Sequence, residues 1–172
     1  MTDTKEKNRW ATTWDCFNDA QHLFGREFEW DVAAEKSTSK CKDNYYGPDR
    51  VPTWMRDSLL IDWPNNYWVN PPFDRKLEFI DHAIKQARRG MTGMMLLPYE
   101  PLAQWWQERL STGVIIYEPD GRYNFLEVDG VTKKNDVNFG SAFVLFVPHL
   151  IGESPRVRFK RGIHKENITV DY

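Results

Sequence analysis

The string Asn70-Pro71-Pro72-Phe73 is the part of this sequence whose residue types and order are best suited to chemistry. Consecutive prolines stiffen the backbone and carry no N–H group that could compete for hydrogen bonds. A residue that precedes proline is held out of helical geometry, so the side chain of Asn70 is directed away from the path of the chain. The Asn70 amide oxygen and the Pro71 carbonyl oxygen are then two fixed acceptors for one NH₂ group, and Phe73 offers a flat face on which a planar base can stack.

Two acceptors of this kind suit the methylation of an exocyclic amine. The lone pair of such an amine is delocalised into the ring, and acceptors on both hydrogens draw the nitrogen toward tetrahedral geometry and fix its position. Proximity to a sulfonium methyl group then supplies much of the remaining catalysis. The alternative is a strand-ending turn without function, but a chance Asn-Pro-Pro-aromatic string is expected in roughly one chain per thousand of this length. We therefore predict four catalytic residues, Asn70, Pro71, Pro72 and Phe73.

The string lies where a short apolar strand, residues 67–69, meets the most regular helical pattern of the sequence. This helix is predicted to begin with Asp74 as its N-cap and to end at Gly90. In open α/β sheets, ligands bind at this end of the strands. Further predicted elements are a helix that Thr12 or Thr13 caps and Gly25 ends, strands over 27–32, 93–97, 114–117 and 142–147, and a helix with Pro101 in its first turn.

The alternation of strands and helices predicts one α/β domain over residues 1–172. We expect three layers, α/β/α, around a mostly parallel sheet, with the last two predicted strands forming an antiparallel hairpin at one edge. Hydrophobic residues make up 41% of the chain and charged residues 28%, which is the composition of a globular protein. A polar excursion over residues 120–138 separates the last two strands, and it is the segment best placed to form a small DNA-contacting insert.

The net charge of −2 excludes a protein that is cationic throughout, although DNA binding needs only a local basic surface. Basic residues gather at residues 5–9, at Lys133-Lys134 and between 156 and 165, and each group could equally be an ordinary solvated face. Two cysteines are too few for a disulfide framework and are poorly placed for a zinc site, so no metal is predicted. The polar N-terminus and the lack of a long apolar run predict no membrane span and an intracellular protein.

Several segments between residue 9 and about residue 147 resemble the phage-encoded DNA N-6-adenine methyltransferases, often called phage Dam. The two specific elements are the Asn-Pro-Pro-Phe string and Asp31-Val32-Ala33-Ala34, which ends the resembling segment Phe28-Glu29-Trp30-Asp31-Val32-Ala33-Ala34. Supporting elements are Trp10-Ala11-Thr12-Thr13, where the family usually has Trp-x-Thr-Pro, then Asp57-Ser58-Leu59, Met94-Met95-Leu96-Leu97-Pro98, Trp105-Trp106, Gly121-Arg122-Tyr123-Asn124-Phe125 and Gly140-Ser141-Ala142.

The resemblance implies a Rossmann-like fold that uses S-adenosylmethionine to methylate N6 of an adenine flipped out of double-stranded DNA. It implies that Asp31 binds near the donor's amino group, that Asp57 accepts from the donor's adenine amine and that residues 10–13 approach its carboxylate. The donor-binding residues implied in this way are Trp10, Thr12, Thr13, Asp31, Val32, Ala33 and Asp57. DNA contacts are expected from Arg122, Lys133 and Lys134, although Arg122 could instead be a structural ion-pair partner. A phage enzyme would act in the host cytoplasm.

The chain departs from the usual pattern where a glycine-rich loop is expected, because Glu35-Lys36-Ser37 occupies that region. A ribose-binding acid is not evident either, and Asp43 and Asp49 are weak candidates. Two alternatives therefore stay open. The chain could be another amine methyltransferase, acting on RNA guanine or protein glutamine, or a non-catalytic DNA-binding or decoy protein with the same fold.

Overall fold

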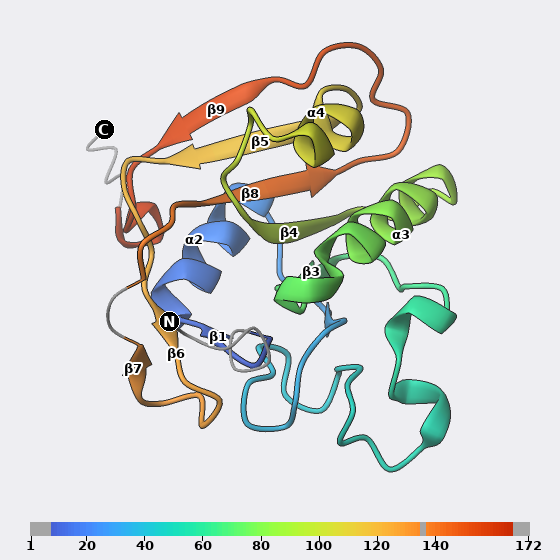
Figure 1. Cartoon of the computed structure of the whole chain (residues 1–172). Coiled ribbons are helices and arrows are strands. Elements are labelled where there is room, and N and C mark those ends of the chain that lie inside the picture. Colours follow the sequence, from blue (N-terminus) through green and yellow to red (C-terminus); the bar gives the residue numbers. More distant parts are fainter. Residues whose placement is uncertain (1–7, 135–136, 167–172) are drawn as a thin grey trace, which may run out of the picture.

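Two β-sheets and three α-helices make up the part of the chain that the computed structural model describes, residues 8–134 and 137–166 (Figure 1). The helices are α2 (Trp14–Phe24), α3 (Lys76–Arg88) and α4 (Gln104–Leu110). The strands are β1 (Ala11–Thr12), β2 (Trp30–Asp31), β3 (Tyr67–Val69), β4 (Gly93–Pro98), β5 (Val114–Pro119), β6 (Phe125–Leu126), β7 (Lys133–Lys134), β8 (Ser141–Phe146) and β9 (Arg156–Phe159). Short 3-10 turns cover Thr53–Met55, Ser58–Leu60, Phe73–Arg75 and Ile163–Lys165.

The larger sheet is mixed and has the strand order β2-β3-β4-β8-β5-β9. Strand β8 runs antiparallel to both of its neighbours, while the other strands share one direction. The late strands β5 and β8 do pair antiparallel, but the prediction of a hairpin at the sheet edge is wrong, because β8 lies between β4 and β5 and β9 forms the edge. In the described residues between β5 and β8 no helix returns the chain to the other end of the sheet, so β8 starts where β5 stops and runs the other way.

Burial explains which strand takes the inner position. All six residues of β8 are buried, as befits a strand with neighbours on both sides and helices above and below. Strand β9 exposes Arg156, Val157 and Arg158, and charged side chains on an edge strand discourage pairing with another chain. Strand β9 was not predicted from the sequence, because its three exposed residues give no apolar run.

Helices cover both faces of the larger sheet (Figure 1). Along β4, Met95 and Leu97 belong to one core cluster together with residues of α3 and α4. Their neighbours Met94 and Leu96 belong to a second cluster together with residues of α2. This alternation is what a strand with two buried faces requires, and it explains why these strands are apolar throughout rather than alternating with polar residues.

Helix α2 begins and ends as predicted, whereas α3 and α4 begin later. The Thr13 hydroxyl accepts from the Cys16 N–H at 3.2 Å, and Gly25 closes α2 with φ of +84°. Asp74 is not the N-cap of α3, because residues 73–75 form a 3-10 turn and the helix starts at Lys76. The two prolines direct the chain into this tight turn before α-helical geometry can begin.

A small antiparallel sheet, β1-β6-β7, lies at the opposite end of the molecule from β9 (Figure 1). The insert predicted over residues 120–138 supplies β6 and β7, and its residues 135–136 lie outside the described residues. Strand β6 pairs with β1, where Thr12 stands opposite Phe125. The insert is therefore joined to the N-terminal segment by backbone hydrogen bonds. Among the described helices, none is long and apolar enough to cross a membrane.

Candidate active site

Three strands each bring a polar residue to the end of the larger sheet at which β2, β3 and β4 finish. Asp31 ends β2, Asn70 follows β3 directly, and Pro98 ends β4. Because β8 runs in the opposite direction, its first residue, Ser141, lies at the same end of the sheet, opposite Pro98. Two cavities meet here, and both are lined by Trp10 and Asn70. Open α/β sheets bind their ligands at this end, where the parallel strands finish.

The large cavity has a volume of about 320 Å³, which falls within the range of small-molecule sites. Its wall combines the N-terminal segment, the turn after β2 and the segment that leads into the second 3-10 turn. Six of the seven residues predicted to bind a methyl donor line it: Trp10, Thr12, Asp31, Val32, Ala33 and Asp57. Thr13, the seventh, caps α2 instead.

Asp31 is the buried acid among the residues that line this cavity. Its side chain is 3% exposed, and burial raises its pKa to about 7, although hydrogen bonds from the Lys40 and Ala33 N–H groups at 3.0 and 3.4 Å favour the ionised form. Backbone hydrogen bonds between Asp31 and the segment 44–46 hold the end of β2 in place. The Asp31 carboxylate is thus held in a fixed place and is poorly solvated. A cationic ligand in the large cavity would therefore interact favourably with it.

Asp57 lines the same cavity but is engaged by the protein. One of its carboxylate oxygens accepts from the Leu59 N–H at 3.0 Å, and the other lies 3.6 Å from the Arg75 guanidinium. Asp43 and Asp49, the candidates for ribose binding, are not among the residues that line this cavity. Asp49 instead accepts from the Lys36 N–H at 2.8 Å.

The turn after β2 is held by side chains where a glycine-rich loop was expected. The Glu35 carboxylate accepts two hydrogen bonds from Arg9, each of 3.0 Å, and the Thr38 hydroxyl accepts from the Glu35 N–H at 3.0 Å. A glycine missed by the sequence analysis completes this wall. A Cβ on Gly47 would lie 1.6 Å from the Ala34 carbonyl oxygen, so only glycine allows these two segments to meet.

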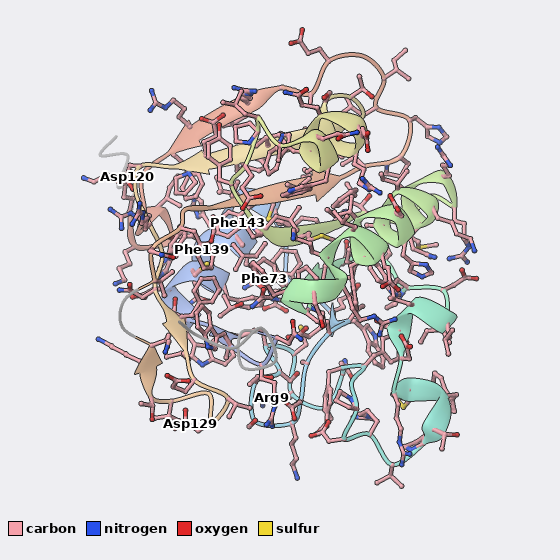
Figure 2. The ribbon with its side chains drawn as sticks, in the orientation of Figure 1. Arg9, Phe73, Asp120, Asp129, Phe139 and Phe143 are labelled. Atoms are coloured by element: carbon pink, nitrogen blue, oxygen red, sulfur yellow. The ribbon has the colours of Figure 1, made fainter. Side chains whose placement is uncertain are left out.

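The small cavity has a volume of about 30 Å³ and is walled mainly by apolar residues, four of which are aromatic. Phe73 and Phe139 lie next to each other with ring centroids 6.4 Å apart (Figure 2). The Trp10 ring is parallel to that of Phe139 within 2°, at a centroid distance of 6.4 Å. The other lining residues are Asn70, Pro71, Lys76, Leu96, Leu97, Pro98, Phe125 and Ser141.

A single contact fixes the orientation of the Asn70 amide. Its nitrogen donates to the Trp10 carbonyl oxygen at 3.4 Å. Because a carbonyl can only accept, this contact distinguishes the amide nitrogen from the amide oxygen. The oxygen is therefore the atom of this amide that can accept a hydrogen bond from a substrate amine.

Neither cavity is lined by the predicted DNA-contacting residues Arg122, Lys133 and Lys134. Lys133 is exposed, whereas Lys134 lies 3.7 Å from Glu127 and its ammonium group is 5.3 Å from the Trp10 ring centroid. The carbonyl of Arg122 accepts from Arg161 at 2.6 Å. Of the basic segment 5–9, residues 5–7 lie outside the described residues.

Several residues of the small cavity could not be recognised from the sequence. Phe139 carried no signal of its own, since it follows a polar segment and precedes the glycine before β8. Ser141 and Phe125 lay within segments noted for resemblance, but nothing in their spacing assigned them a role. Lys76, whose ammonium lies 4.8 Å from the Phe73 ring centroid, had no role assigned from the sequence.

Comparison with known proteins is consistent with this geometry. Residues 1–167 match the sequence model of the family described as DNA N-6-adenine-methyltransferase (Dam). The DNA N-6-adenine-methyltransferase of Haemophilus phage HP1 (strain HP1c1) is 29% identical over 150 residues, which cover 86% of this chain and 83% of the phage protein.

Proposed function

Because this chain belongs to the DNA N-6-adenine-methyltransferase (Dam) family, we propose that it methylates N6 of an adenine flipped out of double-stranded DNA, with S-adenosylmethionine as donor. Its class, an adenine-specific DNA methyltransferase, follows from the family and from the phage relative. The donor, the flipped base and the roles of individual residues are the substance of the proposal.

The observation that carries the proposal is the meeting of two unlike cavities at Asn70 and Trp10. A methyl transfer needs a donor site and an acceptor site that share one reactive point. The large cavity has the size and the buried acid for a charged donor. The small cavity has the aromatic walls for a base, and Asn70 lies between the two.

The large cavity fits the donor in charge as well as in size. When bound, S-adenosylmethionine supplies a methyl group carried on a positively charged sulfur. The carboxylate of Asp31 would bind the donor's ammonium group, and Trp10, Thr12, Val32 and Ala33 would form the surrounding wall. Asp57 would accept from the donor's adenine amine, while Thr13 would act indirectly by anchoring α2.

In the small cavity, the acceptors of the Asn-Pro-Pro-Phe string bind the reacting amine. The Asn70 amide oxygen and the Pro71 carbonyl oxygen accept the two N6 hydrogens, which localises the nitrogen lone pair and fixes its direction. The ring of Phe73 supports one face of the base by stacking. Pro72 contributes rigidity, so the acceptors need little reorganisation during the reaction.

The fold that best accommodates these sites is the Rossmann-like methyltransferase fold, with helices on both faces of the larger sheet. Its DNA contacts would come from Arg122, Lys133 and Lys134, of which Lys134 lies over the ring of Trp10, a lining residue of the small cavity. As a relative of a phage enzyme, the protein would act in the cytoplasm of the host cell.

The proposal is tested by incubating the full chain with double-stranded DNA of mixed sequence and S-adenosylmethionine, followed by mass analysis of the nucleosides. We expect N6-methyladenine, with Asn70→Ala as the matched inactive control. Methyl groups on cytosine, on RNA alone or on protein glutamine would contradict it. Calorimetry with millimolar donor should show binding and thermal stabilisation, and their absence would favour a non-catalytic DNA-binding protein.

A further inference from the structure

Two buried polar groups of the small cavity's lining residues have no hydrogen-bond partner within the described part of the chain. They are the indole N–H of Trp10 and the hydroxyl of Ser141. Ser141 is only 2% exposed. Leaving a buried polar group unpaired costs stability, because the group loses its hydrogen bonds to water and gains none in return, so such groups are rare in folded proteins. Both belong to residues that line the cavity we assign to the target base.

The backbone that carries Ser141 is held firmly. Ser141 is the first residue of β8 and stands opposite Pro98 in the antiparallel pair with β4. One residue earlier, the Gly140 carbonyl accepts from the Tyr99 N–H at 2.9 Å. The hydroxyl is thus mounted on an inner strand of the sheet, where a polar group can be placed accurately against a ligand.

Adenine complements these two groups chemically. Its amine is its only strong hydrogen-bond donor, and Asn70 and Pro71 already provide acceptors for it. The ring nitrogens on either side of the amine, N1 and N7, are both acceptors. An indole N–H can only donate, and a serine hydroxyl can donate as well. Cytosine offers an acceptor on one side of its amine and a C–H group on the other, so a pair of donors favours adenine.

Building on the proposed function, we propose that Ser141 is a specificity-determining residue that donates its hydroxyl hydrogen to a ring nitrogen of the target adenine. The Trp10 indole N–H donates to a second ring nitrogen. The cavity thus recognises adenine by accepting at the amine and donating beside it. A site that is built to hydrogen-bond its substrate discriminates strongly against a base that lacks the matching atom, because its own buried groups then stay unpaired.

The test combines Ser141→Ala with oligonucleotides that carry adenine, 7-deazaadenine or 1-deazaadenine at the mapped target. Single-turnover rates at subsaturating DNA should fall about tenfold to a hundredfold for Ser141→Ala on adenine, the scale of one lost hydrogen bond to a buried group. Both deaza bases should slow the parental enzyme by a similar factor, because each lacks one of the two ring nitrogens that accept a hydrogen bond. On the base that lacks the partner of Ser141, Ser141→Ala should cause no further loss, since the same contact is already missing.

Thermal unfolding separates recognition from a structural role. Ser141→Ala removes an unpaired buried hydroxyl, so its melting temperature should equal or exceed that of the parental protein. Ser111→Ala serves as the matched control, because that hydroxyl has a partner, the Gln107 carbonyl at 2.5 Å, and lines neither cavity. It should keep the parental rate on all three bases.

Two results would overturn the inference while leaving the proposed function intact. One is a parental methylation rate for Ser141→Ala on adenine. The other is a full additional loss when Ser141→Ala is combined with each deaza base. A parental protein that binds the donor and DNA but methylates no adenine would overturn the proposed function and this inference together.

Discussion

The two cavities that meet at Asn70 differ in size and in chemistry. The large one holds about 320 Å³ and is lined by ionisable residues, among them Asp31, Glu35 and Asp57. The small one holds about 30 Å³ and is walled by rings such as Phe73 and Phe139. The first is open to a small molecule as it stands, whereas the second must widen before a purine can enter. Donor binding should therefore depend mainly on charge, and base binding on stacking and side-chain movement.

The first and largest effect is expected where the cavities join. Asn70→Ala should lower the single-turnover methylation rate by at least about a hundredfold, the usual loss for one preorganised contact to a reacting group. The fold should persist, because the prolines set the turn. Near-parental melting and donor affinity would show that the loss lies in the chemical step. A parental rate at saturating donor would refute the role of the amide.

Asp31→Asn should affect the large cavity selectively. We expect donor affinity to fall roughly tenfold to a hundredfold, corresponding to a charge-assisted hydrogen bond of about 1.5–3 kcal/mol. Binding of DNA alone should change little. Calorimetry with S-adenosylmethionine and, separately, with DNA measures both effects. Equal losses for the two ligands would contradict the separation of the cavities.

The same residue predicts a dependence of donor affinity on pH. Because burial raises the pKa of Asp31 to about 7, the carboxyl is largely protonated below that pH and cannot bind a cation well. Affinity should therefore rise as pH increases from about 6 to 8 and then level off, with protons released on binding in the lower part of this range. Asp31→Asn is the control, and an unchanged pH dependence in this variant would assign the titration to another group.

Phe73→Ala should affect the small cavity by an intermediate amount. Loss of one stacking face should weaken retention of the flipped base by about 1–3 kcal/mol, while Phe73→Tyr should preserve most activity because it keeps a flat ring. Phe139→Ala, on the neighbouring wall, should have a similar effect. The measurement is the DNA concentration dependence of single-turnover rates. A loss equal to that of Asn70→Ala at saturating DNA would place Phe73 in the chemical step instead.

The smallest effects are expected at the small sheet. Lys133 is exposed, and Lys133→Ala should weaken binding to all DNA sequences a few-fold. The slope of log affinity against log salt concentration should become less steep by about one. The adjacent Lys134 is engaged by Glu127 and by the Trp10 ring, so Lys134→Ala should change the salt dependence less. Affinities over a series of salt concentrations test this, and equal slopes for both variants would contradict it.

The amino-acid sequence by itself determined the features that depend on near neighbours in the chain. Two prolines after a short strand fix the turn that presents Asn70, and Thr13 and Gly25 set the ends of α2. The enzyme class was also predictable, because several continuous segments, above all the Asn-Pro-Pro-Phe string and residues 31–34, resemble one family. The start of α3 was predicted wrongly, since a 3-10 turn and a capping residue at Asp74 are both consistent with the same residues.

Tertiary structure alone decided the features that join distant segments. The inner position of β8 depends on the path of the chain across the sheet. That position brings Ser141 to the end of the sheet where Asn70 lies. The hydrogen bond from Asn70 to Trp10 spans 60 residues of sequence, and the raised pKa of Asp31 arises from the segments packed around it. Local residue patterns constrain the backbone over a few residues only, so burial and partnership across the sheet become defined once the strands have paired.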